Sequence, residues 1–362
     1  MANPVRYWHW VRAEPFGQSS EIGAAGTINW FVPPVGRGSG GHLNIFRFIR
    51  NLELEGFECR IIVCNDSNPV RPEVLERNIA SWFFPVKAKV FFHPQVEIPS
   101  AFISIATGWQ TAYPVKAFQA TRHRCYFVQD YEPWFYSVGS ESLFAEETYR
   151  FGFLGITAGD WLAEKLRHDF GMTTHPVGFS YDREIYRRLP KRDKIPRVFF
   201  YARPPTARRG YELGLMVLAT LSKRHPEIEI CLAGWDLGRY TIPFRARSAG
   251  ILSLRDLPDL YSQCDAALVI SLSNASLLPL ELMACGCAVV SNRGPNVEWL
   301  LNNDVAILAE PRIDPLVEAL ERAVYDIALH DRLVGNALAK VEMTSWQKEA
   351  AKMAELFRAL GA

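Results

Sequence analysis

The sequence predicts an α/β fold built from two doubly wound domains, each with a parallel sheet. Short runs rich in β-branched and aromatic residues alternate with segments of helical periodicity, which is typical of an open parallel sheet. The alternation stops at residues 181–196, which carry many charges and two prolines, and then restarts. The chain has 362 residues, enough for two domains of ordinary size.

The first domain is expected to span residues 1–180. Apolar residues recur at helical spacing between its strands, notably over 42–55 and 161–170. Its predicted strands are 27–32, 59–63, 89–92, 101–105, 125–128, 154–157 and 175–178.

The second domain is expected to span residues 197–344, after a linker at 181–196. A last amphipathic helix is predicted within 345–362, with Ser345 as its N-cap. The predicted strands of this domain are 197–201, 228–232, 266–270, 288–290 and 305–308, and its helices are 210–224, 257–263, 278–284, 314–329 and 331–340.

Charge and cysteine content narrow the function classes. The chain has 40 basic and 39 acidic residues, which argues against a nucleic-acid partner because such proteins normally show a basic excess. Seven cysteines in a chain of this length do not suggest a disulfide framework, and their spacing does not suggest zinc. No run approaches the ~20 apolar residues that span a bilayer. We therefore expect a cytoplasmic protein, and docking at the inner face of the plasma membrane stays open.

Residues 271–292 read as a strand end, a small-residue turn, a helix, a glycine stop and a second strand. Such a βαβ unit binds ligands at the carboxyl ends of its strands, beside helix N-termini. Ser273, Asn274 and Ser276 lie there, where exposed N–H groups and the helix dipole favour a phosphate. Glu281, on the first turns of the helix, suits sugar hydroxyls. An ordinary structural βαβ unit is the alternative.

A basic loop follows the strand 197–201. Arg203 ends that strand, and Arg208 and Arg209 precede Gly210 and a predicted helix. A guanidinium group can donate two hydrogen bonds to the oxygens of a phosphate. A diphosphate leaving group also needs a nearby positive charge as its negative charge develops. A solvated basic loop is the alternative.

Two segments of the first domain also follow strand ends. Gly40 and Gly41 form part of a glycine-rich loop that ends at His42, where the backbone could approach a ligand closely. Glycine content alone is equally compatible with a flexible turn. A dense aromatic phrase at 126–136 contains Asp130, Glu132 and Trp134, in which carboxylates suit sugar hydroxyls and aromatic faces suit sugar rings. Ordinary core packing also explains such aromatics.

Residues 271–292 resemble the nucleotide-sugar motif of retaining family 4 glycosyltransferases, which have the GT-B fold. Glu281 matches the second glutamate of that motif, whereas the first falls on Ser273. Arg203 matches the arginine after the preceding strand. Arg209 occupies the position of a lysine, with Arg208 as the alternate.

The phrases 126–136, 199–210 and 292–299 further resemble bacterial rhamnosyltransferases that build surface polysaccharides. The resemblance implies two Rossmann-like domains with an active site in the interdomain cleft, and a final helix, 345–362, that packs back on the first domain. It also implies retention of configuration, no cofactor, no bound metal, and a nucleotide-diphosphate sugar donor, with dTDP-rhamnose as the first candidate. The acceptor is expected to be an oligosaccharide or lipid-linked glycan of O-antigen, capsule or S-layer type.

The resemblance also implies roles for individual residues. Arg203 and Arg209 hold the diphosphate as it leaves, Glu281 binds the ribose or the donor sugar, and Asp130 positions the acceptor. The backbones of Ser276 and Leu277 donate to phosphate, and Gly40 and Gly41 line the donor and acceptor sides. His42, Glu132 and Trp134 are expected on the acceptor side.

Other functions stay open on the sequence alone. A nucleotide-sugar epimerase or a phosphorylase could use the same architecture, and Ser273 could mark a non-catalytic glycan- or nucleotide-binding module. Asp130 and Glu132 could also form a metal motif of the GT-A type, although that fold has one domain and this chain is predicted to have two. Association with a membrane surface or with a multidomain polymerase is a further expectation.

Overall fold

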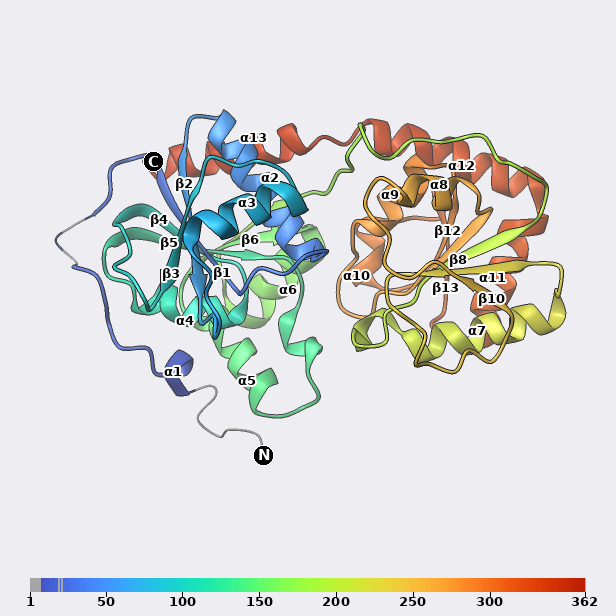
Figure 1. Cartoon of the computed structure of the whole chain (residues 1–362), viewed down its shortest axis with the longest axis horizontal. Helices are drawn as coiled ribbons and strands as arrows, with labels where there is room; N and C mark the ends of the chain where they lie inside the picture. Colours follow the sequence, from blue (N-terminus) through green and yellow to red (C-terminus); the bar gives the residue numbers. More distant parts are fainter. Residues whose placement is uncertain (1–7, 19, 21, 362) are drawn as a thin grey trace. The chain divides into compact units, whose positions relative to one another are not determined.

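A computed structural model describes residues 8–18, 20 and 22–361. The chain divides into two compact units: unit 1 contains Met1–Gly178 and Trp346–Ala362, and unit 2 contains Phe179–Ser345. Each unit has one parallel sheet with helices on both faces (Figure 1). The predicted α/β class with two doubly wound sheets is therefore confirmed.

Unit 1 has a seven-stranded sheet in the order β3-β2-β1-β4-β5-β6-β7, and every strand pair is parallel. The direction of winding reverses between β1 and β4, and open α/β sheets bind ligands beyond the carboxyl ends of the strands at such a reversal. The strands are β1 (Thr27–Val32), β2 (Glu58–Cys64), β3 (Lys89–His93), β4 (Ala101–Ala106), β5 (Thr121–Val128), β6 (Leu154–Ala158) and β7 (Thr174–Val177). The helices are α1 (Trp8–Val11), α2 (Gly40–Leu54), α3 (Pro72–Trp82), α4 (Trp109–Ala117), α5 (Ser140–Glu147), α6 (Asp160–Phe170) and α13 (Trp346–Ala359), with short 3-10 helices at Glu132–Phe135 and Thr148–Arg150.

Successive residues of β1 pack on opposite faces of this sheet, as strand geometry requires. Trp30 and Phe48 of α2 both contact Phe127, with ring centroids 5.9 and 5.0 Å away. Phe31 contacts Phe118 on the other face, at 5.7 Å. Both faces of β1 are fully buried, so its carboxyl end is held rigidly.

The last helix, α13, packs on α2 within unit 1. Trp346 meets Phe48 edge-on at 6.1 Å, and Phe357 meets Phe57 at 6.0 Å. The Arg47 guanidinium lies 4.8 Å from the centroid of the Trp346 ring. These contacts fix α2, whose first turn carries the glycine loop.

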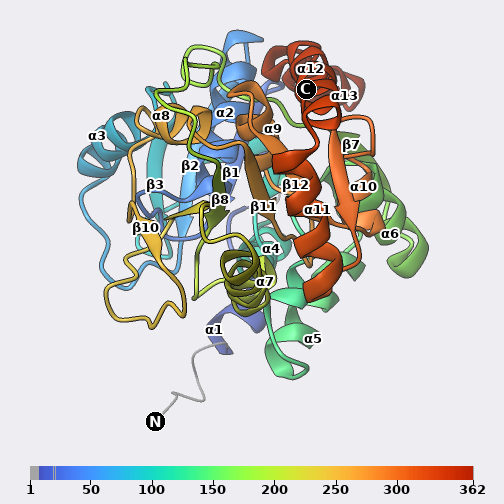
Figure 2. The same cartoon turned by 90° about the vertical axis from the view of Figure 1, so that its right-hand side faces the viewer.

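Unit 2 has a six-stranded parallel sheet in the order β10-β9-β8-β11-β12-β13, with its winding reversed between β8 and β11. Helices α7 and α11 lie on one face of it (Figure 2). The strands are β8 (Arg197–Tyr201), β9 (Glu229–Ala233), β10 (Ala246–Ser248), β11 (Ala266–Val269), β12 (Ala288–Asn292) and β13 (Ala306–Ala309). The helices are α7 (Tyr211–Arg224), α8 (Leu257–Ser262), α9 (Leu278–Ala284), α10 (Pro295–Glu298), α11 (Ile313–Tyr325) and α12 (Ile327–Glu342), with a 3-10 turn at Ala207–Arg209.

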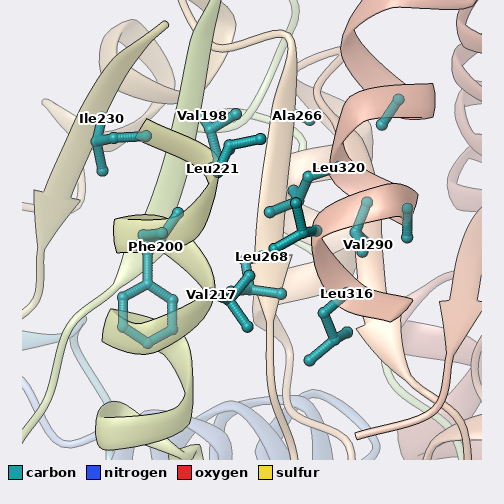
Figure 3. Packing of buried hydrophobic residues seen from close by; sticks show 14 of the residues in the cluster. Val198, Phe200, Val217, Leu221, Ile230, Ala266, Leu268, Val290, Leu316 and Leu320 are labelled. Carbon is teal, nitrogen blue, oxygen red and sulfur yellow. The ribbon is translucent and has the colours of Figure 1, made fainter. Parts of the chain in front are cut away.

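The core of unit 2 is a layer of branched aliphatic side chains between the sheet and these two helices. Figure 3 shows Val217 of α7 and Leu316 of α11 against Leu268 of β11. Phe200 fills the space beside α7, where a Cβ on Gly214 would stand 2.2 Å from its Cζ. The glycine lets α7 approach β8 closely, which fixes the basic loop that joins them.

Residues 181–196, expected to be a linker, lie in unit 2 and pack along α8. Tyr186 stacks on Tyr261 at 6.3 Å. The backbone N–H of Leu189 donates to Ser262 Oγ (3.0 Å), and that of Arg192 donates to Gln263 Oε1 (2.8 Å). The prediction of an interdomain linker rested on charge and proline content, which do not reveal backbone hydrogen bonds to a distant helix.

The predicted helix 314–329 is wrong at its end. The helix α11 stops at Tyr325, and α12 begins at Ile327. Asp326 separates them because its side chain accepts a hydrogen bond from Leu329 N (3.0 Å) and so caps α12.

Candidate active site

The residues of unit 2 that were predicted to bind the donor follow β8 and β11, the two strands between which the winding reverses. Arg203 and the 3-10 turn Ala207–Arg209 follow β8, and the segment 271–277 follows β11. Since β8 and β11 are adjacent parallel strands, both segments leave the same edge of the sheet. Crevices at such reversal points are where open α/β sheets bind ligands.

Arg209 connects these two segments. Its Nη1 donates to Ser271 Oγ at 2.7 Å and to the backbone oxygen of Asn274 at 3.1 Å. Gly210 has φ +59°, and a Cβ there would lie 2.6 Å from Ile270 Cγ2. Only glycine therefore brings the basic loop close enough for Arg209 to reach across.

Arg208 lies on the same side of the sheet as Arg209. Its backbone oxygen accepts a hydrogen bond from Leu272 N at 2.9 Å. Two successive arginines of one loop are thus bound to the segment after β11, one through its backbone and the other through its side chain.

Arg203 lies toward β9. Its Nη1 donates to Tyr201 Oη at 3.0 Å, and its guanidinium carbon is 5.8 Å from the centroid of the Trp235 ring. No residue that the structure describes accepts a hydrogen bond from its buried Nε. Gly234, with φ +111°, brings its backbone against the Tyr201 ring, where a Cβ would be 2.3 Å away.

The segment after β11 presents backbone more than side chains. Ser273 and Asn274 are fully buried (0% exposed), whereas Ser276 and Leu277 are half-buried and precede α9. Leu277, at the N-cap, has no side chain able to cap the helix. Glu281 is half-buried on the first turn of α9. Ser273 and Asn274, both predicted to bind the donor, are therefore less accessible than Ser276 and Leu277.

The glycine loop of unit 1 ends in a capped helix. Gly40 and Gly41 are exposed at the start of α2, and Ser39 caps it. Ser39 Oγ lies 3.4 Å from His42 N and 2.9 Å from His42 Nδ1. His42 Nε2 is 3.2 Å from Pro33 O.

These contacts assign the protonation of His42. Pro33 O can only accept, so Nε2 carries the proton and donates to it, and Nδ1 accepts from the Ser39 hydroxyl. Burial lowers the pKa of His42, while the hydrogen bond to Pro33 raises it by a smaller amount. A neutral ring in this place orders the loop.

Gln129 links β5 to the first turn of α2. Its Nε2 donates to Gly41 O at 3.2 Å, and its Oε1 accepts from Asn44 Nδ2 at the same distance. The next residue, Asp130, is buried, and its Oδ1 accepts from Tyr131 N at 2.9 Å. The structure therefore brings Gly41 and the strand end before Asp130 together.

Glu132 is bonded within the fold. It is 6% exposed; its Oε2 accepts from Trp109 N (2.8 Å), at the start of α4, and its Oε1 accepts from Tyr126 Oη (2.7 Å). Burial, followed by the nearby Glu132 charge, raises the pKa of Tyr126 well above its ordinary value. This carboxylate fastens α4 to β5.

Trp134 is 48% exposed. It therefore differs from the buried Glu132 in accessibility, although the two residues are close in sequence. Its ring lies 6.0 Å from that of Trp161, and Lys165 Nζ is 5.3 Å from its centroid. Trp134 offers an aromatic face to solvent, which suits a sugar ring.

Sequence reasoning did not assign roles to Tyr201 and Trp235 beside Arg203, to Gln129, or to the polar residues of 292–299. The phrase 292–299 was noted only for its resemblance. The signal that could have revealed a role for this phrase is Asn292 at a strand end, followed by Asn296 and Trp299.

Across the described part of the chain, no group of three or more His, Cys, Asp or Glu side chains is placed to hold a metal ion. Within the same residues, helices fall short of the length and apolar character needed to cross a bilayer.

Comparison with known proteins identifies relatives of this chain. A family described as WsaF, C-terminal domain, matches residues 196–321. The O-antigen biosynthesis protein RfbC of Myxococcus xanthus is 36% identical over 338 residues, which is 90% of this chain and 26% of RfbC. The chain thus spans about a quarter of that relative. A human phosphatidylinositol N-acetylglucosaminyltransferase polypeptide is 27% identical over 130 residues, 33% of this chain and 27% of that protein.

Solved structures share the fold. Sucrose-phosphate synthase from Thermosynechococcus elongatus has a TM-score of 0.72 at 14% identity and covers 92% of this chain and 98% of its own. Anabaena Alr3699/HepE, solved with UDP-glucose, has a TM-score of 0.71 at 17% identity and covers 92% and 99%. The fold is that of the GT-B glycosyltransferases.

Proposed function

We propose that this chain, whose residues 196–321 belong to the WsaF C-terminal domain family and whose units form a GT-B fold, is a glycosyltransferase of surface-polysaccharide assembly. It moves a sugar from a nucleotide-diphosphate donor to a growing glycan of O-antigen, capsule or S-layer type. The similarity to RfbC supports this acceptor class.

One observation carries the proposal: Arg209 spans the two segments that leave β8 and β11 at the winding reversal. A cation held at that edge neutralises the charge that develops on a diphosphate as the glycosidic bond breaks. Arg203 and Arg208 add to the positive electrostatic potential at this edge of the sheet. The backbone N–H groups of Ser276 and Leu277 complete the phosphate contacts.

The donor is a nucleotide sugar, with dTDP-rhamnose as the first candidate. HepE was solved with UDP-glucose, which supports the donor class. Glu281 binds the ribose or the donor sugar. Ser273 stands where the family motif has a glutamate, and the loss of one hydroxyl partner fits a deoxysugar.

Unit 1 presents the acceptor near Gly40, Gly41 and Asp130, with Trp134 as a stacking face. His42 and Glu132 act by holding this edge, since their polar atoms are bonded within unit 1. The reaction retains configuration, as the resemblance to family 4 glycosyltransferases implies, and it uses no metal, because the arginines neutralise the departing diphosphate. We place it at the cytoplasmic face of the membrane, where a lipid-linked acceptor or a larger polymerase would meet it.

Release of nucleoside diphosphate, measured with and without an oligosaccharide acceptor across a panel of nucleotide sugars, tests the proposal. Release that depends on acceptor, with the product's anomeric configuration matching the donor's by NMR, is the expected result. Sugar interconversion without acceptor would instead indicate an epimerase. Nucleotide binding without turnover by the 362-residue chain would indicate a binding module.

A further inference from the structure

The segment 292–299 ties down the segment 271–275 through a set of short hydrogen bonds. Asn292, 3% exposed at the end of β12, uses both ends of its amide on Ser271. Its Oδ1 accepts from Ser271 N at 2.8 Å, and its Nδ2 donates to Ser271 O at 3.0 Å. The side chain thereby holds the chain beyond the last paired residues of β11 and β12, Val269 and Ser291.

Asn296 makes a second attachment. Its Nδ2 also donates to Ser271 O, at 2.8 Å, and its backbone oxygen accepts from Ala275 N at 2.9 Å. Gly294 makes room for this side chain, because a Cβ there would stand 2.6 Å from Asn296 Oδ1 and its φ is +150°. The position of the Asn296 side chain therefore requires a glycine at residue 294.

Trp299 makes a third attachment, to the residue that Arg209 also contacts. Its Nε1 donates to Asn274 Oδ1 at 2.8 Å, and the same oxygen accepts from Ala275 N at 3.0 Å. The backbone oxygen of Asn274 accepts from Arg209 at 3.1 Å. Asn274 is therefore held by Trp299 through its side chain and by Arg209 through its backbone.

We propose that Asn292, Asn296 and Trp299 are positioning residues that hold the 271–277 segment, and through it Arg209, in the arrangement that binds the donor diphosphate. This inference rests on the proposed function. A segment ordered before binding loses less conformational freedom when the nucleotide arrives, so its affinity is higher. The three residues act through Ser271, Asn274 and Ala275 and need not touch the donor.

The variant Trp299→Phe tests the inference. Phenylalanine keeps an aromatic ring beside Phe179, whose ring centroid is 5.5 Å from that of Trp299, and it loses the indole N–H together with one of the two fused rings. We expect affinity for UDP and dTDP, measured by calorimetry well below the melting temperature, to fall about threefold to tenfold, as expected for one buried hydrogen bond. The KM for the donor should rise by a similar factor, while the KM for the acceptor stays constant.

Trp109→Phe is the matched control. It deletes the same group in unit 1, where Trp109 Nε1 donates to Tyr136 Oη at 2.9 Å. Donor affinity should not change in this variant. Asn292→Ala removes both hydrogen bonds to Ser271 and should lower donor affinity more than about tenfold. If this variant does not fold, the Trp299→Phe variant tests the positioning role by itself.

The outcomes separate the two proposals. If the unaltered chain binds neither UDP nor dTDP nor any nucleotide sugar, the proposed function fails. If the unaltered chain binds and Trp299→Phe binds within twofold of it, or if Trp109→Phe weakens binding equally, the positioning role is overturned. A lowered melting temperature with unchanged donor KM also overturns it, since that result describes a structural residue alone.

Discussion

The two sheets share one topology at the winding reversal but end in different kinds of edge. In unit 1 the polar side chains beyond the strands are bonded within the unit: His42 to the Ser39 hydroxyl and the Pro33 backbone oxygen, and Glu132 to the Trp109 backbone N–H and the Tyr126 hydroxyl. In unit 2 the edge carries Arg208 and Arg209 against a segment whose own polar groups are bonded to the next strand and helix, while Arg203 lies beside Tyr201 and Trp235. The first edge uses its hydrogen-bonding groups within unit 1, whereas at the second edge Arg209 joins the segments that follow β8 and β11.

The comparison teaches that residue type alone does not separate a structural acid from a functional one. Glu132 and Asp130 are spaced like catalytic carboxylates, yet both oxygens of Glu132 accept hydrogen bonds from unit 1. Arg209 is also hydrogen-bonded, but to the segment that it orders. Changes at the two edges should therefore be distinguished by measuring donor affinity and stability on the same variants.

Arg209→Ala should have the largest effect. It removes a cation and its bonds to Ser271 and Asn274, so donor affinity should fall by about 3 kcal/mol or more, over a hundredfold. Calorimetry with UDP and dTDP checks this. Arg224→Ala, which alters an exposed ion pair at the far end of α7, is the control, and equal weakening by both variants would contradict a specific role.

Glu132→Ala should mainly reduce stability. The Trp109 N–H and the Tyr126 hydroxyl lose their acceptor in a buried place, which costs about 2–4 kcal/mol in the free energy of unfolding. Urea denaturation checks this, with Glu146→Ala, part of a surface pair with Arg150, as the control. A stable Glu132→Ala variant that loses only acceptor affinity would show that the contrast between the edges is wrong.

Arg203→Ala should weaken donor binding by about 2–3 kcal/mol if its guanidinium meets a desolvated phosphate. Its side chain is held by Tyr201 and faces Trp235, so Tyr201→Phe should produce a smaller loss in the same direction. Unfolding should change little in either variant. Unchanged affinity in Arg203→Ala would remove this residue from the site.

The sequence was sufficient to predict much of this fold. Strand 27–32 and helix 278–284 match β1 and α9 residue for residue. The strand is a short apolar run between Gly26 and Pro33, and Gly286 follows the helix closely. Helix α4 was missed. It contains Pro114 and is apolar almost all round, so it lacks the amphipathic pattern on which the prediction depends.

The candidate site was predictable only where chemistry and strand ends coincide. Arg203 and Arg209 satisfy both conditions. Burial of Asn274 was not predictable, since its side chain accepts a hydrogen bond from Trp299, which follows a later strand and helix. Contacts between segments that are distant in the sequence produce no local sequence pattern. The hydrogen bond from Trp109 N to Glu132 could not be predicted for the same reason.

His42 should give the smallest effect, through pH. Burial lowers its pKa from the ordinary value of about 6.5, so the unfolded chain binds a proton below that pH which the folded chain does not. Stability contributed by the neutral ring is therefore present above about pH 6.5 and is lost as pH falls below it. The loss at about pH 5 is at most about 2 kcal/mol for one proton. Free energies of unfolding from about pH 8 to 5 should fall less steeply in His42→Gln than in the unaltered chain, and parallel curves would show that the ring does not order the glycine loop through its neutral form.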